Sequence, residues 1–355
     1  MNNKIHGIQV MRGVAASMVA FGHFAAVAEE LYGSEQGLSS SLRTFHSTIG
    51  QSGVDIFFCI SGFIIVLITG KQRRNTVFRD AAYFLFRRII RIYPLFWIAL
   101  AASIIVERTW LTIASEQAWL TVVGHGPLAS IVLYDTPVAL PIAWTLMFEV
   151  RFYALIAMVL LVFRAKLQKG ILIACLGTVT CVSLTSLQIL PYVRIGDRIM
   201  LEFVFGALVG LAVINRITVL PRVMVIVGLL WFLATTFFTS GDVAVYRIWG
   251  YGFPAALFLY GLVTIERQRG LRVPRWLLAI GDWSYSIYLW HWVIMRSLAH
   301  GALQLEHTPG TAIAFMATGL AATYFAGYLS FRFIERPLFQ VAKFSLRPQE
   351  PAPAT

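Results

Sequence analysis

The 355-residue chain is strongly apolar: 58% of its residues are hydrophobic and only 13% are charged. A soluble domain carries about a quarter charged residues, so this composition excludes an ordinary soluble protein. The formal net charge of +12 does not indicate nucleic-acid binding, because the basic residues fall in short clusters between apolar runs. Composition and charge therefore predict a multi-pass membrane protein with no nucleic-acid partner.

Ten apolar stretches of about 17–22 residues follow one another along the chain, each long enough to cross a hydrocarbon core of about 30 Å. These candidate spans are residues 10–28, 53–69, 91–107, 143–163, 170–187, 199–214, 223–239, 248–265, 279–298 and 312–331. We predict an all-α fold, a polytopic transmembrane helix bundle of about ten spans. Residues 1–340 are expected to form one membrane domain, and residues 341–355 a short cytoplasmic tail.

The basic residues between the spans predict the orientation. With the N-terminus placed in the cytoplasm, 22 of the 29 Lys and Arg residues lie on the cytoplasmic side and five on the other side, and the remaining two lie within spans. Basic loops remain preferentially in the cytoplasm. Both termini are therefore expected to be cytoplasmic, which also requires an even number of spans.

The first span carries two ionisable residues, Arg12 and His23, which are eleven positions apart. Eleven steps of an α-helix return to within about 20° of the same face and advance about 16 Å along the axis. Arg12 is expected at the cytoplasmic mouth and His23 in the outer half of the membrane. Ionisable groups at this depth are costly and often functional, although a snorkelling arginine and a structural histidine would give the same pattern.

Three further spans carry polar residues at a similar expected depth: Asp55, then Glu149 with Tyr153 one helical turn away, and His291. Structural pairing could explain any one of them, and Asp55 in particular. Taken with His23, the four groups predict a polar site where four helices converge. Trp144, at the start of the same span as Glu149, is a further candidate for contact with a substrate.

Before the third span, Arg88 and Arg91 are spaced to lie on one helical face beside the membrane. One interpretation is that these arginines do no more than set the topology. Their geometry also suits bidentate recognition of phosphate groups.

Together these motifs resemble the membrane-bound acyltransferase-3 family, which includes O-acetyltransferases of O-antigen, exopolysaccharide and Nod factors. The resemblance covers almost the whole chain. It is carried by Arg12-X10-His23, Gly53-Val-Asp-Ile-Phe-Phe with Ser61-Gly-Phe, Arg88-X-X-Arg91 with Ile92-Tyr-Pro, Trp144-Thr-Leu with Glu149 and Phe152-Tyr153, Ser284-Tyr-Ser-Ile-Tyr-Leu-Trp-His291, and Glu335-Arg-Pro.

The resemblance implies ten core helices in the bacterial cytoplasmic (inner) membrane, a cytoplasmic acyl-CoA donor and a carbohydrate acceptor. The acceptor would be an exopolysaccharide, an O-antigen or a lipid-linked oligosaccharide. Some relatives carry an SGNH esterase-like domain, whereas this chain looks like the stand-alone form. The segment around Thr145, Met147 and Arg151 departs from the usual pattern, so chemistry on the acceptor side can differ.

Acyl transfer from a thioester to a sugar hydroxyl needs a base and a binding site for the polyanionic CoA. We expect Arg88, Arg91 and Arg12 to bind the CoA phosphates, and His23 to act as the base. Asp55 or Glu149 would orient His23. Tyr153, His291 and Trp144 are candidates for acceptor or oxyanion contacts.

Acetyl-CoA is the expected donor, with succinyl or another short acyl group as the alternative. No permanently bound cofactor is expected. No metal site is expected either, because Cys59, Cys175 and Cys181 show no ligand spacing. A transporter or flippase for a glycan or lipid-linked intermediate would also carry buried charges, but discontinuous helices and an internal repeat would favour it. A non-catalytic scaffold would leave the polar residues unexplained.

Overall fold

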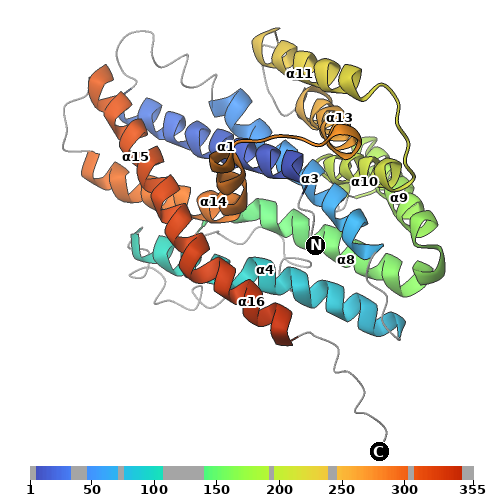
Figure 1. Cartoon of the computed structure of the whole chain (residues 1–355). Coiled ribbons are helices and arrows are strands. Elements are labelled where there is room, and N and C mark those ends of the chain that lie inside the picture. The colour runs from blue at the N-terminus through green and yellow to red at the C-terminus, as the bar shows by residue number, and fades with distance from the viewer. Residues whose placement is uncertain are drawn as a thin grey trace, which may run out of the picture.

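The computed structural model describes residues 5–32, 46–70, 76–106, 140–191, 196–238, 246–302 and 308–345. Throughout these ranges the regular structure is helical and no strand occurs, as Figure 1 shows. The all-α prediction is therefore confirmed for the described residues.

The long helices follow the chain in the order in which the apolar stretches predicted them. They are α1 (His6–Tyr32), α3 (Gln51–Thr69), α4 (Val77–Val106), α8 (Trp144–Phe163), α9 (Leu167–Ser186), α10 (Met200–Ile214), α11 (Pro221–Phe238), α13 (Phe253–Arg269), α14 (Arg275–Ala302) and α15 (Pro309–Ser330). Short turns of π or 3₁₀ geometry adjoin several of them: η1 (His46–Gly50), η2 (Pro141–Ala143), η3 (Arg164–Lys166), η5 (Ile248–Gly252) and η6 (Phe331–Glu335). The last described helix is α16 (Arg336–Ser345).

Each of the ten predicted spans coincides with one of these long helices. Among the described residues, seven helical segments are long and apolar enough to cross a membrane, one of them containing both α8 and α9. Two helices fall outside this group for different reasons. The apolar helix α10 has only 15 residues, whereas α14 has 28 residues but carries many polar side chains. Several of the polar side chains of α14 belong to the candidate site described below.

Helix α1 lies at the centre of the bundle and packs against α14, α3 and α15. Glycines allow its closest approaches. Gly22 of α1 meets Gly50 of η1 backbone to backbone, and Gly281 of α14 lies against the backbone of Gln9. A side chain at any of these glycines would push the helices apart, as is typical of small residues where membrane helices cross. These contacts fix the positions of Arg12 and His23 relative to α3 and α14.

Hydrogen bonds at the helix ends join segments that the basic residues assign to the same side of the membrane. The backbone N–H groups of His6 and Gly7 both donate to Glu266 at the end of α13, at 2.7 Å. Arg164, between α8 and α9, forms an ion pair of 2.7 Å with Asp80 at the start of α4. The alternation of the helices therefore agrees with the predicted topology. Which side faces the cytoplasm stays a prediction.

The predicted boundary of the membrane domain at residue 340 falls within α16, which continues to Ser345. The rest of the predicted tail, residues 346–355, lies outside the described residues.

Candidate active site

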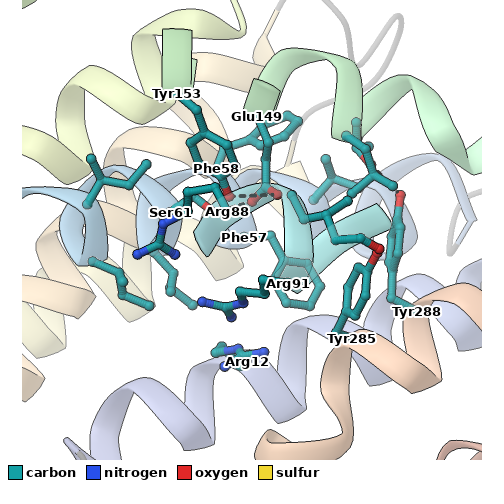
Figure 2. A pocket seen from close by; sticks show the side chains of 17 residues that line it. Arg12, Phe57, Phe58, Ser61, Arg88, Arg91, Glu149, Tyr153, Tyr285 and Tyr288 are labelled. Atoms are coloured by element: carbon teal, nitrogen blue, oxygen red, sulfur yellow. Dashed lines mark hydrogen bonds between the residues drawn. The ribbon is translucent and has the colours of Figure 1, made fainter. Parts of the chain in front are cut away.

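A cavity of about 70 Å³ lies between α1, α3, α4, α8 and α14. Three arginines line it: Arg12 from α1, and Arg88 and Arg91 from α4. Figure 2 shows Arg12 and Arg91 close together and Arg88 to one side of them. The structure thus brings together the three arginines that the sequence proposed for CoA binding, although two of them are about 76 residues from the third. A cluster of cations in one pocket suits an anionic ligand.

Arg88 is only 6% exposed, yet no hydrogen-bond partner satisfies its Nε atom. Its guanidinium lies over the rings of Phe84 and Tyr153, at 5.7 Å from each centroid. Aromatic faces hold a cation without neutralising it. The charge of Arg88 is therefore kept available to the pocket. This differs from a residue that only sets topology, which would extend toward water.

Glu149 lies in the wall of the same pocket and accepts two hydrogen bonds. One comes from Ser61 of α3 through a short contact, and the other comes from Tyr153 at 3.1 Å. Glu149 and Tyr153 share a face of α8, as their spacing predicts. Because Tyr153 also lies beneath Arg88, this cluster connects the carboxylate to the arginine end of the pocket.

The cavity is also lined by two tyrosines of α14, Tyr285 and Tyr288. Neither was among the predicted site residues. Tyr285 donates to the carbonyl of Ile92 at 2.7 Å. The hydroxyl of Tyr288 lies 2.9 Å from the carbonyl of Ile142 and 2.7 Å from Oγ1 of Thr145. The spacing of Tyr285, Tyr288 and His291, three residues apart, was the available signal that they share one helical face.

Beyond Tyr288, His23 of α1 meets His291 of α14. Nε2 of His291 lies 3.2 Å from Nδ1 of His23, and the ring centroids are 5.0 Å apart. A third ring, that of Trp292, stands edge-on to His23 at 5.7 Å. The structure therefore brings together two of the four groups expected to converge.

The contacts of the histidine pair assign the protons. Nδ1 of His291 is 2.6 Å from the carbonyl of Tyr288, and because a carbonyl only accepts, this nitrogen carries the hydrogen. Nε2 of neutral His291 is then an acceptor. Nδ1 of His23 faces that acceptor and the carbonyl of Val19, at 2.9 Å, so it too carries a hydrogen. This tautomer leaves the lone pair of His23 on Nε2, which is the arrangement a base requires.

The other two groups lie elsewhere, and this corrects the expected arrangement. Asp55 is fully buried and forms an ion pair of 2.6 Å with Arg247. Glu202 of α10 is also fully buried and interacts electrostatically with both residues. The hydrogen bonds of Glu149 go to the pocket hydroxyls described above. His23 thus contacts His291 and the carbonyl of Val19, whereas Asp55 and Glu149 were expected beside it and have the partners given above.

Trp144, expected to contact a substrate, lies outside the cavity lining and beneath Arg247, whose guanidinium is 5.5 Å from its ring. The cluster of Asp55, Glu202, Arg247 and Trp144 thus joins α3, α10, α8 and the segment leading into η5. Glu202 was not among the predicted site residues, and Arg247 was one of the five basic residues assigned to the non-cytoplasmic side. An acidic residue inside the apolar run 199–214 was the signal that could have found Glu202.

Glu335 also lies beside the site. It is buried, accepts a hydrogen bond of 2.7 Å from Ser286 of α14, and interacts electrostatically with Arg12 and Arg91. The turn η6 thus brings a carboxylate from the end of the chain next to the arginines of the pocket.

Comparison with known proteins identifies the family of the chain. Residues 5–332 match the family model described as an acyltransferase domain, that of the acyltransferase-3 family. The chain is 28% identical over 313 residues to the exopolysaccharide production protein ExoZ of Rhizobium meliloti, covering 83% of this chain and 91% of ExoZ. It is 29% identical over 334 residues to the peptidoglycan O-acetyltransferase OatA of Listeria monocytogenes, covering 81% of this chain and 51% of OatA.

A third relative is the acyltransferase MdmB of Streptomyces mycarofaciens, which is 26% identical over 352 residues and matches 89% of this chain and 87% of its own length. No solved structure matches the chain. Because the family model covers nearly all of the helix bundle, including both histidines and all three pocket arginines, the chain belongs to the acyltransferase-3 family and is a membrane acyltransferase.

Proposed function

We propose that this protein transfers a short acyl group, most simply acetyl, from cytoplasmic acyl-CoA to a hydroxyl of a surface or exported glycan, or of its lipid-linked precursor. The bacterial cytoplasmic membrane is the proposed location. The observation that carries the proposal is one cavity lined by three arginines, with a pair of histidines just beyond its opposite wall.

The arginine end of the cavity suits the donor. CoA carries phosphate groups, and Arg88 and Arg91 lie on the face of α4 that enters the pocket. In the proposed topology this end opens toward the cytoplasm, where acyl-CoA is found. Eleven residues, or about 16 Å, separate Arg12 from His23 along α1, a length that the extended pantetheine arm can span.

The histidine pair suits the transfer step. Nε2 of His23 would take the proton from the acceptor hydroxyl as its oxygen attacks the thioester carbon. His291 would hold the ring of His23 in place and share the charge of the resulting imidazolium. When the tetrahedral intermediate collapses, the carbon–sulfur bond breaks and the CoA thiolate takes the proton from His23. The products are an ester and free CoA, and no proton is gained or lost.

The proposal of a glycan acceptor is supported by the names of two relatives and by the proposed topology. One relative is named for exopolysaccharide production and another for O-acetylation of peptidoglycan. Both names refer to a glycan polymer, and the second also to O-acetylation. In the proposed topology, His23 would lie in the half of the membrane opposite the cytoplasmic face, where an exported glycan or the head group of a lipid-linked oligosaccharide could reach it.

The experiment compares surface polysaccharide from cells with and without the gene by mass spectrometry, together with acetyl-CoA binding by the purified protein in nanodiscs. We expect a gene-dependent acetyl ester and saturable binding. A glycan that is present but no longer exported, with its acylation unchanged, would support the alternative of a transporter or flippase. A gene-dependent succinyl ester would retain the acyltransferase and change only the acyl group.

A further inference from the structure

Two buried hydroxyl groups converge at the end of the cavity nearest the histidines. Oγ1 of Thr145 lies 3.0 Å from the carbonyl of Ile142, and the hydroxyl of Tyr288 lies 2.9 Å from the same oxygen. The two hydroxyl oxygens are 2.7 Å apart. Thr145 and Tyr288 are each only 6% exposed. Two O–H donors are therefore gathered around a single carbonyl oxygen of the protein.

This hydroxyl pair stands between the donor cavity and the histidine pair. Both side chains line the cavity that contains the three arginines. The backbone carbonyl of Tyr288 accepts the hydrogen bond from His291, and the rings of Tyr288 and His291 have centroids 5.7 Å apart. An acyl group that reaches this end of the cavity therefore meets the two hydroxyls, with the histidine pair directly behind Tyr288.

Attack on a thioester places negative charge on the carbonyl oxygen, and donors directed at that oxygen lower the barrier. A hydroxyl hydrogen turns freely about its C–O bond, so Thr145 and Tyr288 could direct their hydrogens from Ile142 to a substrate oxygen with little movement. In this buried setting such bonds are stronger than they would be in water.

We propose that Thr145 and Tyr288 form the oxyanion site of the enzyme and donate hydrogen bonds to the thioester carbonyl oxygen of the acyl-CoA. This inference rests on the proposed acyl-CoA donor. As the acceptor oxygen bonds to the carbonyl carbon, the π electrons of the C=O bond move to the oxygen held by the two hydroxyls. They return when the C–S bond breaks. Neither hydroxyl loses its proton.

The same hydroxyls also tie α14 to η2 and α8, so removing one can lower stability without any role in catalysis. If the role is purely structural, a variant should lose affinity for every CoA ligand alike. If the two hydroxyls form an oxyanion site, a variant should lose affinity only for a ligand that carries the carbonyl-derived oxygen. The test therefore compares two non-reactive ligands, S-ethyl-CoA, which lacks the carbonyl, and a trifluoromethyl ketone analogue of acetyl-CoA, whose hydrate resembles the tetrahedral intermediate.

The affinities of both ligands are measured for the full-length protein in nanodiscs, with Tyr288→Phe, Thr145→Val and Thr145→Ser as variants. The unsubstituted protein should prefer the ketone analogue. Tyr288→Phe and Thr145→Val should lose most of that preference while binding S-ethyl-CoA normally, and Thr145→Ser should keep it. Turnover should fall by about 100- to 1,000-fold for Tyr288→Phe, which is the usual loss for one oxyanion donor.

Tyr260→Phe is the matched control, because the Tyr260 hydroxyl also joins two elements, through the N–H of Val219 and the carbonyl of Ile217. It should keep both the preference and the turnover. Preference for the ketone analogue that survives in both Tyr288→Phe and Thr145→Val would overturn the oxyanion site and leave the donor proposal standing. Failure of the unsubstituted protein to bind either ligand would overturn the donor proposal and, with it, this inference.

Discussion

Individual polar residues in this bundle have distinct surroundings, and their contacts indicate which role to test for each one. Arg88 is buried against aromatic rings inside the cavity, whereas its neighbour Arg87 is exposed and lies over Tyr83. The Arg-X-X-Arg spacing was enough to place Arg88 and Arg91 on one face. That spacing alone says nothing of Arg12, which was grouped with them only through the expected CoA site. Its place in the same pocket depends on how α1 and α4 are arranged around the cavity.

Replacing Arg88 with Ala should weaken acyl-CoA binding at least several-fold while the protein still folds and inserts. Lysine should rescue only part of the loss, because it lacks the planar fork that binds phosphate with two hydrogen bonds. Binding of labelled acetyl-CoA to the purified variants measures the effect, and Arg87→Ala is the control on the same helix. Equal affinity in Arg88→Ala and Arg87→Ala would return Arg88 to the role of setting topology.

At the scale of the elements, ion pairs and small residues fix the helices that carry the site. Hydrophobic stretches predicted the positions of the ten long helices in the described part of the chain, since each needs only its own sequence to satisfy its backbone hydrogen bonds in a membrane. The partners of the buried polar groups could not be predicted in this way. Asp55 was expected beside His23, but it pairs with Arg247, which follows it by 192 residues. Such pairing depends on the tertiary arrangement.

The pairing of Asp55 gives a prediction about stability. Asp55→Asn removes the ion-pair partner of Arg247, leaving only the electrostatic interaction with Glu202, and should destabilise the protein by up to about 3–5 kcal/mol. Thermal unfolding in nanodiscs measures the loss. The double variant Asp55→Asn with Arg247→Met removes both charges and should recover part of it. Acyl-CoA binding by the folded fraction should stay near normal, and a selective loss of turnover without loss of stability would instead restore Asp55 to the catalytic group.

For the whole molecule, the distribution of basic residues and the contacts between helix ends agree. The segments joined by Glu266 with His6 and by Arg164 with Asp80 were all assigned to one side by the charge bias. A bundle with ends paired in this way keeps the arginine end of the cavity and the histidine pair at different depths. In the proposed topology, that separation would let a cytoplasmic donor meet an acceptor from the other side.

The topology prediction is tested with reporter fusions at the C-terminus and within residues 71–79. Both should report the cytoplasm, because 22 of the 29 basic residues lie on that side. A C-terminal reporter on the outer side would reverse the orientation and place the arginines of the cavity away from cytoplasmic acyl-CoA.

The most direct measurement is acyl transfer by the His23→Gln variant, purified and correctly folded in nanodiscs. Glutamine keeps much of the hydrogen-bonding shape of histidine but cannot take up a proton. The variant should bind acetyl-CoA as the unsubstituted protein does, while transfer falls by about 100- to 10,000-fold, the range for loss of a general base. Near-normal transfer by His23→Gln would contradict the account, because the base at the end of the cavity would then have to be another group.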